Sequence, residues 1–500
     1  MLVEKILLWL DAGFIQFGIA KFLQNIVDAE FFAIIDTNEG KEFFKNQKFI
    51  GFRKIWFYRD CFTRNKKTNI EFLIDFEKKY SINLWKIIYS DVLFNKYNKF
   101  YKFKLEEIFL IIEQEIKLYE QILNEVKPNF LIIRTTDYSK NQILCQLCKA
   151  KKIPILSLGH TRLGEKCIIT TENDLLDDHQ KILQLEKSKK FSWEELQSNL
   201  EIYSESQKSM VKTYQASLSG KISAAWYFVT RVMNGEYRKY YEHQGWSISN
   251  LLKNEFSAFF QRRFRKRFIE KNSTKELKFN EKYVYFPLQF EPERTLLIAS
   301  PFYTNQLEVL KNVAKSLPID YFLFVKEHPS QSLNNWRKIE YYKQILKIPN
   351  VKFIHPSISS LTLVKNSDLV VTITGTSGLE AAFFQKPSIV FGDSIYSDLS
   401  CVHRVKKLEE LPKIIKTSLK KKVELGELDN FMNIIERNSF EFDITKMQME
   451  IDEIFHFDAF LQDVQIDNKK MSIFLEKNKS IFSNLADAHL KKIMIYKNLK

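Results

Sequence analysis

Short apolar runs alternate with longer amphipathic segments along the first third of the chain. The apolar runs lie at residues 6–10, 31–35, 130–133 and 153–158. Between them, apolar side chains recur at helical spacing at residues 14–26, 105–126 and 141–149. Strands that alternate with helices build a parallel sheet covered by helices on both faces. We therefore predict a doubly wound, Rossmann-like α/β domain over residues 1–172.

The same alternation returns in a second block. Its strand-like runs lie at residues 283–288, 321–325, 351–354, 369–373 and 388–391, and its helical segments at 306–316, 359–366 and 379–384. These elements predict a second Rossmann-like domain over residues 283–420. Residues 173–282 lose the strand signals and favour helix, so we predict a helical insertion there. Residues 421–500 are predicted to form a helical C-terminal tail, and two placements stay open for residues 455–500: across the first domain or as an appendage.

Charge and cysteine content constrain the partners and the compartment. The 500 residues include 76 Lys and Arg against 61 Asp and Glu, and the net charge of +15 favours anionic partners. No apolar run reaches the ~18 residues of a membrane-spanning helix. The apolar start of the chain is interrupted at Asp11 and lacks a cleavage site, so no signal peptide is expected. Five cysteines suit a reducing cytoplasm, and Cys145 and Cys148 are predicted to pack in the core.

A turn of small residues, Thr374-Gly-Thr-Ser-Gly378, follows the apolar run at 369–373. Small residues let backbone N–H groups converge, and a helix that starts there adds its positive dipole end, so the turn predicts a phosphate site. The turn matches neither the Walker A loop nor the Gly-x-Gly-x-x-Gly fingerprint. Ser377 and Glu380 also have the spacing of a capping box, a purely structural role. The turn alone leaves both interpretations open.

A second polar cluster, Lys326-Glu-His328-Pro329, follows the apolar run at 321–325. Because parallel strands end at the same rim of a sheet, this cluster and the small-residue turn are expected to meet. Micromolar binding of a sugar donor needs about 8 kcal/mol of binding free energy, so several groups must contact its phosphate. A helix dipole contributes only ~0.3–1 kcal/mol, and a charged hydrogen bond contributes ~1.5–3 kcal/mol. A phosphate dianion beside His328 favours the charged imidazole.

Four motifs in a fixed order carry a resemblance to a known family. They are Phe286-Pro-Leu-Gln-Phe-Glu-Pro-Glu293, Lys326-Glu-His-Pro329, Thr374-Gly-Thr-Ser-Gly-Leu-Glu380 and Lys386-Pro387. This set resembles the capsule polysaccharide biosynthesis glycosyltransferases over about residues 283–396, and the first domain matches only in pattern. The family, with the related bacterial Kdo- and sialyltransferases that carry a His-Pro motif, has the GT-B fold. In that fold two Rossmann-like domains face each other across a cleft.

The resemblance implies a site for a nucleotide-activated sugar in the second domain. It implies phosphate contacts from Lys326, His328 and the turn residues Thr374, Gly375, Thr376, Ser377 and Gly378. It further implies that Glu380 reaches the ribose and that Glu291 lies near the sugar or base. The resemblance leaves a CMP- or a UDP-linked donor open, and it implies that the acceptor is a growing surface polysaccharide or glycolipid. No Asp-x-Asp motif stands out, which agrees with the metal independence usual for GT-B enzymes, and no separate cofactor is expected.

An inverting transfer needs a base on the first domain, within ~3 Å of the acceptor oxygen. Asp11, Asp137 and His160 follow predicted strands and are candidates, and Asp11 is our choice together with His328 as catalytic residues. The alternative role of Asp11 is to cap the next helix. The alternative role of His160 is a loop hydrogen bond. Arg162 also lies past a strand end.

One stretch of the predicted insertion, Phe259 to Phe268, mixes aromatic residues with five cations between Arg262 and Arg267. One interpretation is a helix on an anionic membrane surface. The other is a solvated basic face whose aromatic side chains pack inward. Nucleic acid is not expected, because no recognised binding module surrounds the stretch. The cysteine content and the lack of a signal peptide predict a cytoplasmic location. Peripheral contact with the inner membrane face stays an open alternative.

Two rival functions fit the same sequence features. A sugar-nucleotide epimerase shares the two-domain architecture, and it converts its nucleotide sugar without an acceptor. A non-enzymatic polyanion-binding protein at the membrane would ignore nucleotides and bind with a steep salt dependence.

Overall fold

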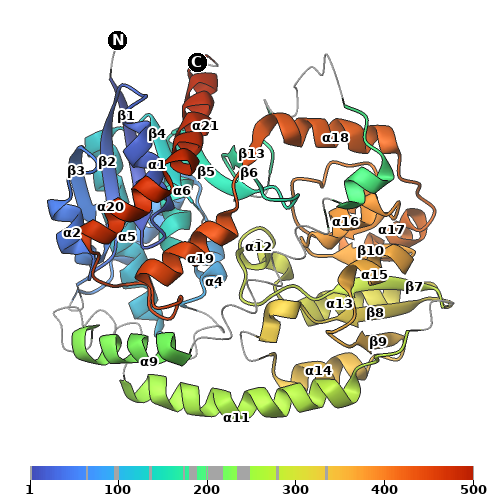
Figure 1. The fold of residues 1–500 in the computed structure, drawn as a ribbon. Helices are drawn as coiled ribbons and strands as arrows, with labels where there is room; N and C mark the ends of the chain where they lie inside the picture. Colours follow the sequence, from blue (N-terminus) through green and yellow to red (C-terminus); the bar gives the residue numbers. More distant parts are fainter. Residues whose placement is uncertain are drawn as a thin grey trace.

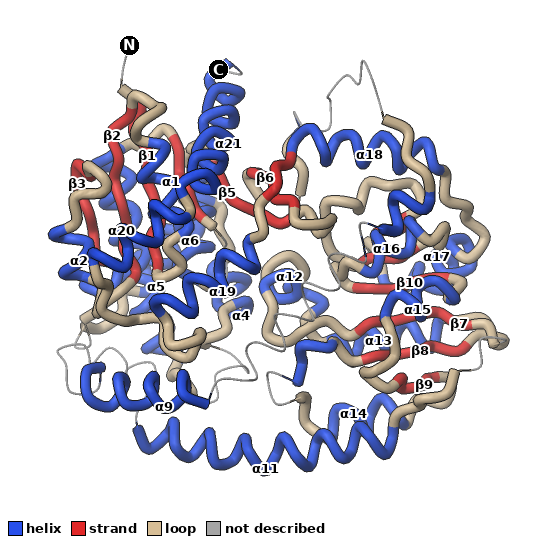
Figure 2. The backbone as a smooth tube through the Cα atoms, viewed as in Figure 1, coloured by secondary structure: helices blue, strands red, loops and turns tan. Residues whose placement is uncertain are grey.

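The computed structural model describes residues 3–63, 66–94, 101–134, 138–172, 175–178, 189–198, 200, 218–232, 248–277, 281–332 and 336–498. Two α/β domains lie side by side, and two helices of the predicted insertion run along one edge below them (Figure 1). Each domain is built on its own sheet (Figure 2).

The first sheet has seven strands in the order β13-β6-β5-β4-β1-β2-β3. Its strands are β1 (Glu4–Asp11), β2 (Ala29–Asp36), β3 (Phe52–Phe57), β4 (Phe130–Ile133), β5 (Ile155–His160), β6 (Lys166–Thr170) and β13 (Ser439–Glu441). Strands β1 to β5 pair in parallel in the Rossmann order 3-2-1-4-5. The order reverses between β1 and β4, so the carboxyl ends of these two strands open on the crevice of this domain.

Both faces of the first sheet are covered, because alternate residues of a strand point to opposite faces. Leu7 and Trp9 pack in the cluster formed with α3 (Ile70–Tyr80), α4 (Leu84–Ser90), α5 (Leu105–Val126) and α6 (Ser139–Ala150). Ile6 and Leu8 pack on the other face with α1 (Ile15–Leu23) and with three C-terminal helices. These helices are α19 (Ile444–Phe455), α20 (Asn468–Lys477) and α21 (Lys479–Asn498). The end of the chain therefore belongs physically to the first domain.

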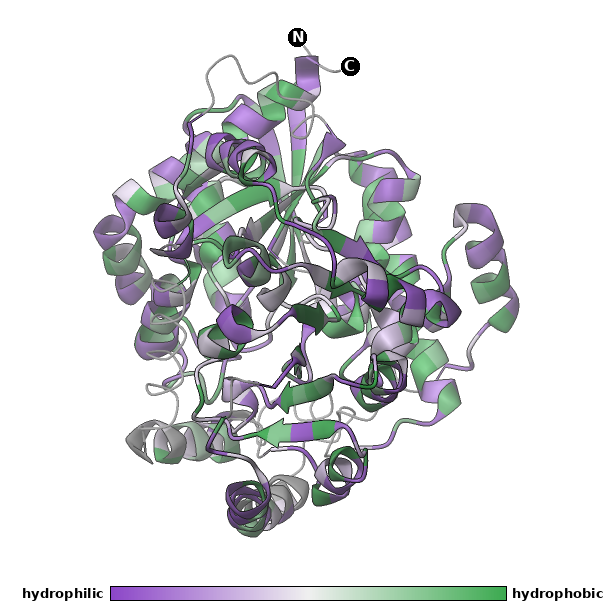
Figure 3. Cartoon of the chain, turned by 90° about the vertical axis from the view of Figure 1, so that its right-hand side faces the viewer, coloured by the Kyte–Doolittle hydropathy of each residue, from purple (hydrophilic) through white to green (hydrophobic). Residues whose placement is uncertain are grey.

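The second sheet has six strands, all paired in parallel, in the order β12-β11-β10-β7-β8-β9. They are β7 (Tyr283–Pro287), β8 (Phe322–Lys326), β9 (Val351–Ile354), β10 (Leu369–Thr372), β11 (Ser388–Val390) and β12 (Val402–Arg404). Read from β9, this is the Rossmann order 3-2-1-4-5-6, with its reversal between β7 and β10. All four residues of β10 are buried, and the apolar colour in Figure 3 is concentrated on such strands.

Helices cover the second sheet. They are α12 (Arg294–Leu297), α13 (Gln306–Ser316), α14 (Ile339–Leu346), α15 (Ser360–Asn366), α16 (Ser377–Phe383) and α17 (Leu411–Ser418). Among them, α12 and α14 were not predicted. The described parts of residues 173–282 include α9 (Leu218–Tyr227) and α11 (Ile248–Asn272). From the second domain, α18 (Leu425–Asn438) leads back to the first.

The predicted fold class is confirmed as two Rossmann-like domains with helical additions. One detail of the prediction is wrong: the first sheet is not wholly parallel, because β6 and β13 form an antiparallel edge. The C-terminal tail at 421–500 is helical as predicted, apart from the short strand β13 that it contributes to that edge. Cys145 and Cys148 are buried free thiols, so the predicted packing role is confirmed.

We expect Gly18→Ala to destabilise the first domain. A methyl group at Gly18 would lie 2.2–2.5 Å from three ring atoms of Phe482 on α21. Phe482 is itself buried, and its ring centroid lies 5.7 Å from that of Phe474. It therefore has no room to retreat, and such overpacking costs about 1–3 kcal/mol.

The control is Gly426→Ala on α18, where nothing lies within 4 Å of the added methyl. A Gly to Ala change in an open helix is expected to be neutral or stabilising by up to about 1 kcal/mol. Urea unfolding of the two variants compares them directly. Equal midpoints would contradict the close contact between α1 and α21.

Candidate functional site

A cavity of about 690 Å³ opens between the two domains. Most of its wall comes from loops after the second-sheet strands β7, β8, β9 and β10. The first domain contributes His160 and Arg162 from the end of β5, and Leu200 adds to the wall. The two domains therefore face each other across a cleft. This is the place at which the switch-point rule puts a ligand in an open α/β sheet.

His328 lines the cavity directly after β8. Its Nδ1 accepts a hydrogen bond from the backbone N–H of Ser330 at 3.2 Å. In the neutral ring the proton is therefore on Nε2, which makes Nε2–H a donor. Burial, with Lys326 and Arg337 nearby, lowers the pKa of His328 to about 4. The charged ring expected beside a phosphate is thus not the form of the ligand-free protein.

Below His328 lies a buried ionic cluster. Glu327 accepts hydrogen bonds from the His328 backbone N–H at 2.8 Å, from Arg337 Nε at 2.8 Å and from the Tyr342 hydroxyl at 2.7 Å. Arg337 also lies 2.8 Å from the Glu291 carboxylate and donates to the Gln289 carbonyl. The cluster ties the loop after β8 to the loop after β7. The sequence analysis missed Arg337, because nothing in its neighbourhood marks it as a partner of Glu327.

The small-residue turn is held in place from below and from the sides. The side-chain oxygen of Gln289 accepts from the N–H groups of Gly375 at 2.8 Å and of Thr374 at 3.1 Å, in the orientation that satisfies both ends of the amide. The Tyr396 hydroxyl donates to the Gly375 carbonyl. A methyl group added at Gly378 would lie 2.6 Å from the Tyr396 hydroxyl, so the turn packs closely against this tyrosine. These contacts make the turn a rigid wall.

The capping box, which was the structural interpretation of the spacing between Ser377 and Glu380, does not form. Helix α16 begins at Ser377, and its cap residue Thr376 already has right-handed helical geometry with no side-chain cap. Glu380 instead accepts from the Thr376 hydroxyl at 2.9 Å, and burial raises its pKa. Within the described part of the chain, the backbone N–H groups of Thr376 and Ser377 have no hydrogen-bond acceptor. They stay available at the cavity wall, although α16 is too short for its dipole to add much.

Arg162 joins the first domain to this wall. Its Nη1 donates to the carbonyl of Thr374 at 2.7 Å. Its backbone has a positive φ of 67°, and its N–H donates to Nδ1 of His160 at 2.7 Å. Because Nδ1 accepts this bond, the proton of the neutral His160 ring is on Nε2. Burial lowers the pKa of His160 to about 4. In the neutral ring of His160, Nε2–H is therefore a hydrogen-bond donor and not a proton acceptor.

The structure brings six of the predicted donor residues to the cavity and leaves others away from it. The residues that line it are Lys326, His328, Gly375, Thr376, Ser377 and Glu380. Four predicted residues are not among the lining residues: Asp11, Glu291, Thr374 and Gly378. The Glu291 carboxylate forms an ion pair with Arg337 and accepts a hydrogen bond from Gln306 Nε2 at 2.7 Å. Thr374 and Gly378 instead pack within the turn: the Thr374 hydroxyl donates to the Thr295 carbonyl at 3.3 Å, and Gly378 lies against the Tyr396 side chain.

Asp11 ends β1, at the point where the strand order of the first sheet reverses. Its carboxylate accepts from the Gly13 N–H at 2.8 Å. Burial raises its pKa, and the nearby Arg134 opposes that rise. Asp137, the other acidic candidate, lies outside the described residues. Among the residues that the structure does describe, no group of three or more His, Cys, Asp or Glu is placed to hold a metal ion.

Comparison with known proteins covers the second domain best. Residues 196–421 match the family model described as capsule polysaccharide biosynthesis protein. The resemblance carried by the four motifs is thereby confirmed for that part of the chain. The protein FixF of Sinorhizobium fredii is 32% identical over 120 residues, which is 23% of this chain and 27% of FixF. The chain thus matches little more than a quarter of that relative's length.

Solved structures add only weak likenesses. The β-Kdo 2,7 transferase KpsC of Thermosulfurimonas dismutans is 13% identical with a TM-score of 0.30, covering 66% of this chain and 88% of that one. A UDP-GlcNAc 2-epimerase of Methanocaldococcus jannaschii, in complex with UDP-GlcNAc and UDP, is 13% identical with a TM-score of 0.27. It covers 87% of this chain and 99% of that one. Scores this low carry no argument about activity.

Proposed function

Because residues 196–421 match capsule polysaccharide biosynthesis proteins, we propose that this chain is a glycosyltransferase. It moves a sugar from a CMP- or UDP-linked donor to a growing surface polysaccharide or glycolipid, and it works in the cytoplasm. The observation that carries the proposal is the shared cavity. His328 and the small-residue turn, more than forty residues apart in the chain, line one space that the first domain closes.

The donor phosphate is assigned to the rim formed by β8 and β10. His328 donates from Nε2, and Lys326, whose Nζ lies 2.8 Å from the Ser360 hydroxyl, supplies positive charge. The backbone N–H groups of Thr376 and Ser377 add two further donors. Donors fixed before the reaction stabilise the charge that develops on a departing phosphate without a reorganisation cost. Several such bonds, at ~1.5–3 kcal/mol each, reach the energy that micromolar binding requires.

The nucleoside and the acceptor are assigned to the two ends of the cavity. Glu380 is assigned to the ribose, since this residue lines the cavity beside the turn. The acceptor hydroxyl approaches from the first domain. Asp11 is the proposed base, because it ends β1 where the strand order of the first sheet reverses, and because burial raises the pKa of its carboxyl group. Asp11 does not line the open cavity, so this role requires further closure of the two domains around the substrates.

A donor panel tests the proposal. The protein is incubated with CMP- and UDP-linked sugars, with and without oligosaccharide acceptors, and the products are separated by mass. Transfer from one donor class to an acceptor is the expected result. Conversion of a UDP sugar to its epimer without acceptor would replace the proposal with the epimerase alternative. If nucleotides do not shift the melting temperature and the protein binds only heparin, the result would support the polyanion-binding alternative.

We expect Arg162→Ala to raise the KM for the donor by about 10- to 100-fold, the range of a lost hydrogen bond from a charged group. The change removes the donor to the Thr374 carbonyl and one cation of the cavity wall. Steady-state kinetics at saturating acceptor measure the KM for the donor. Arg53→Ala is the control, because Arg53 is exposed and pairs with Glu30 away from the cavity. An unchanged KM for Arg162→Ala would remove the interdomain contact from the account.

A further inference from the structure

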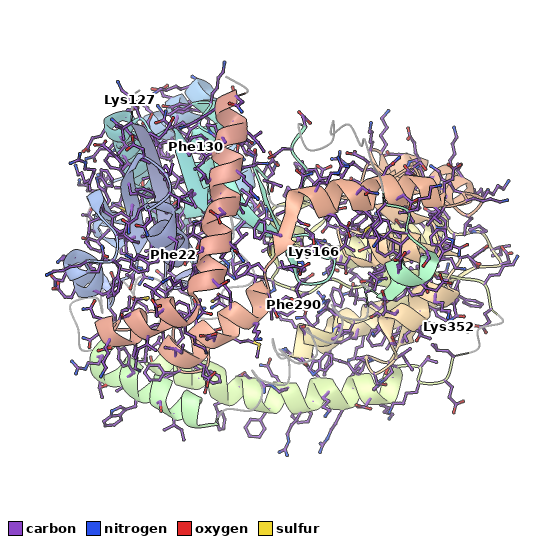
Figure 4. All side chains as sticks on the ribbon, turned by 45° about the horizontal axis from the view of Figure 1, so that its top comes forward. Phe22, Lys127, Phe130, Lys166, Phe290 and Lys352 are labelled. Atoms are coloured by element: carbon purple, nitrogen blue, oxygen red, sulfur yellow. The ribbon has the colours of Figure 1, made fainter. Side chains whose placement is uncertain are left out.

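Helices α9 and α11 form one edge of the molecule below both domains. They lie side by side in the views of Figures 1 and 4. Their inner faces are anchored. Ala224 of α9 and Phe228 directly after it pack with Leu461 and Val464, and Ile269 of α11 belongs to the core of the second domain. The outer faces of both helices are therefore held in fixed orientations.

The outer faces carry two apolar stripes at helical spacing. On and directly after α9, Ile222, Trp226 and Val229 are exposed to 65%, 72% and 41%. On α11, Phe256, Phe260 and Phe264 are exposed to 71%, 46% and 58%. The interpretation in which the aromatic residues of this stretch pack inward is therefore wrong for Phe260 and Phe264. Single exposed apolar residues are ordinary, but stripes on two adjacent helices mark an interaction surface.

Exposed cations surround the stripe on α11. Arg263 and Arg267 follow Phe256 by seven and eleven residues, so they share its side of the helix. Arg262 and Lys266 are exposed beside them. The acidic Glu270 near the end of the helix pairs with Lys275 at 3.0 Å and with His355 at 3.1 Å. The net character of the face is thus positive.

We propose that the outer faces of α9 and α11 dock on an anionic lipid bilayer. Phenylalanine, tryptophan and aliphatic side chains gain by entering the boundary between headgroups and acyl chains, while arginine and lysine stay at the charged headgroups. Binding of nucleic acid would explain the exposed cations, but it would not explain the exposed aliphatic side chains of Ile222 and Val229. None of the helices described in the structure is long and apolar enough to cross a membrane. The proposed contact is therefore made at the surface of the bilayer.

Vesicle flotation with the full-length protein tests this docking face. Vesicles of phosphatidylcholine with about 30 mol% phosphatidylglycerol are compared with phosphatidylcholine alone. We expect the protein to float with the anionic vesicles. The variant R263E/R267E is expected to lower the apparent affinity at least about ten-fold. The variant F260S/F264S is expected to lower it by a similar factor at constant charge.

Matched controls lie on the second domain. K413E/K416E on α17 reverses two exposed cations, and Ile319→Ser removes an exposed apolar side chain. Both are expected to bind like the unchanged protein, and circular dichroism checks the fold of every variant. Equal binding to neutral vesicles, or equal loss in the α17 control, would overturn the proposal. Retention of the protein by single-stranded RNA without any flotation would also overturn it.

Discussion

Replacing His328 with alanine is expected to lower turnover of the true donor by about 10²–10³-fold, the usual effect of deleting one preorganised donor to developing charge. The reason is geometric. The ring lines the interdomain cavity, and the bond from Ser330 to Nδ1 leaves Nε2–H as the donor. His328→Gln should recover part of the activity, because its side-chain N–H reaches a similar position.

The control for His328 is His403→Ala on β12, a half-buried histidine outside the lining of the cavity. Its turnover is expected to match that of the unchanged protein. Unchanged turnover for His328→Ala, measured on the donor that the panel identifies, would remove His328 from the phosphate site.

The pH dependence follows from the same ring. Its pKa of about 4 in the ligand-free protein keeps it neutral above pH 5. Nε2–H is then present across the neutral range, and donor binding should not weaken between pH 6 and pH 8 through loss of a proton from His328. A ring with an ordinary pKa near 6.5 that had to be charged would lose affinity steadily as the pH rises through that window.

Replacing Arg337 with methionine is expected to destabilise the second domain by about 3–5 kcal/mol. Arg337 is buried and bridges two carboxylates, Glu327 and Glu291, so its removal leaves both negative charges without their cation. The His328 loop should also shift, because Glu327 holds the backbone N–H of His328. Denaturant unfolding monitored by fluorescence measures the loss.

The partner substitutions separate charge from packing. The variant R337M/E327Q/E291Q removes the cation together with both carboxylate charges, and it should recover a large part of the stability, since uncompensated buried charge is the main cost. Lys352→Met, at a half-exposed ion pair with Glu281, is the control and should change stability by about 1 kcal/mol or less. A loss of under about 1 kcal/mol for Arg337→Met would show that the cluster does not hold the site together.

Local pattern predicted much of this fold. Helix α5 and strand β4 begin and end at the predicted residues, because the apolar periodicity is strong and Pro128 separates them. Strands β12 and β13 have three residues each and are too short to show a pattern. The structure decides between the two placements left open for residues 455–500, because their helices pack on the first domain. This packing depends on Gly18 meeting the Phe482 ring, and no local signal links residues so far apart.

The site shows the same division. The rim formed by β8 and β10 was predictable, since parallel strands end at one edge, and the order of the motifs located His328 and Thr376 there. The Arg162 contact with Thr374 joins positions 212 residues apart and is set by how the domains meet. Glu291 has a role that its motif did not reveal. Its motif position suggested a ligand contact, yet in the structure Arg337 and Gln306 take up the carboxylate.

The central claim is that one interdomain cavity grips the phosphate of a nucleotide sugar, and a crystal structure with the donor nucleotide bound tests it most directly. The account predicts phosphate oxygens within hydrogen-bond distance of His328 Nε2, of Lys326 Nζ and of the N–H groups of Thr376 and Ser377. A second cavity of about 510 Å³, lined in part by Lys86, Lys149 and Arg294, offers the alternative. Phosphate bound there, or anywhere away from His328, would contradict the account.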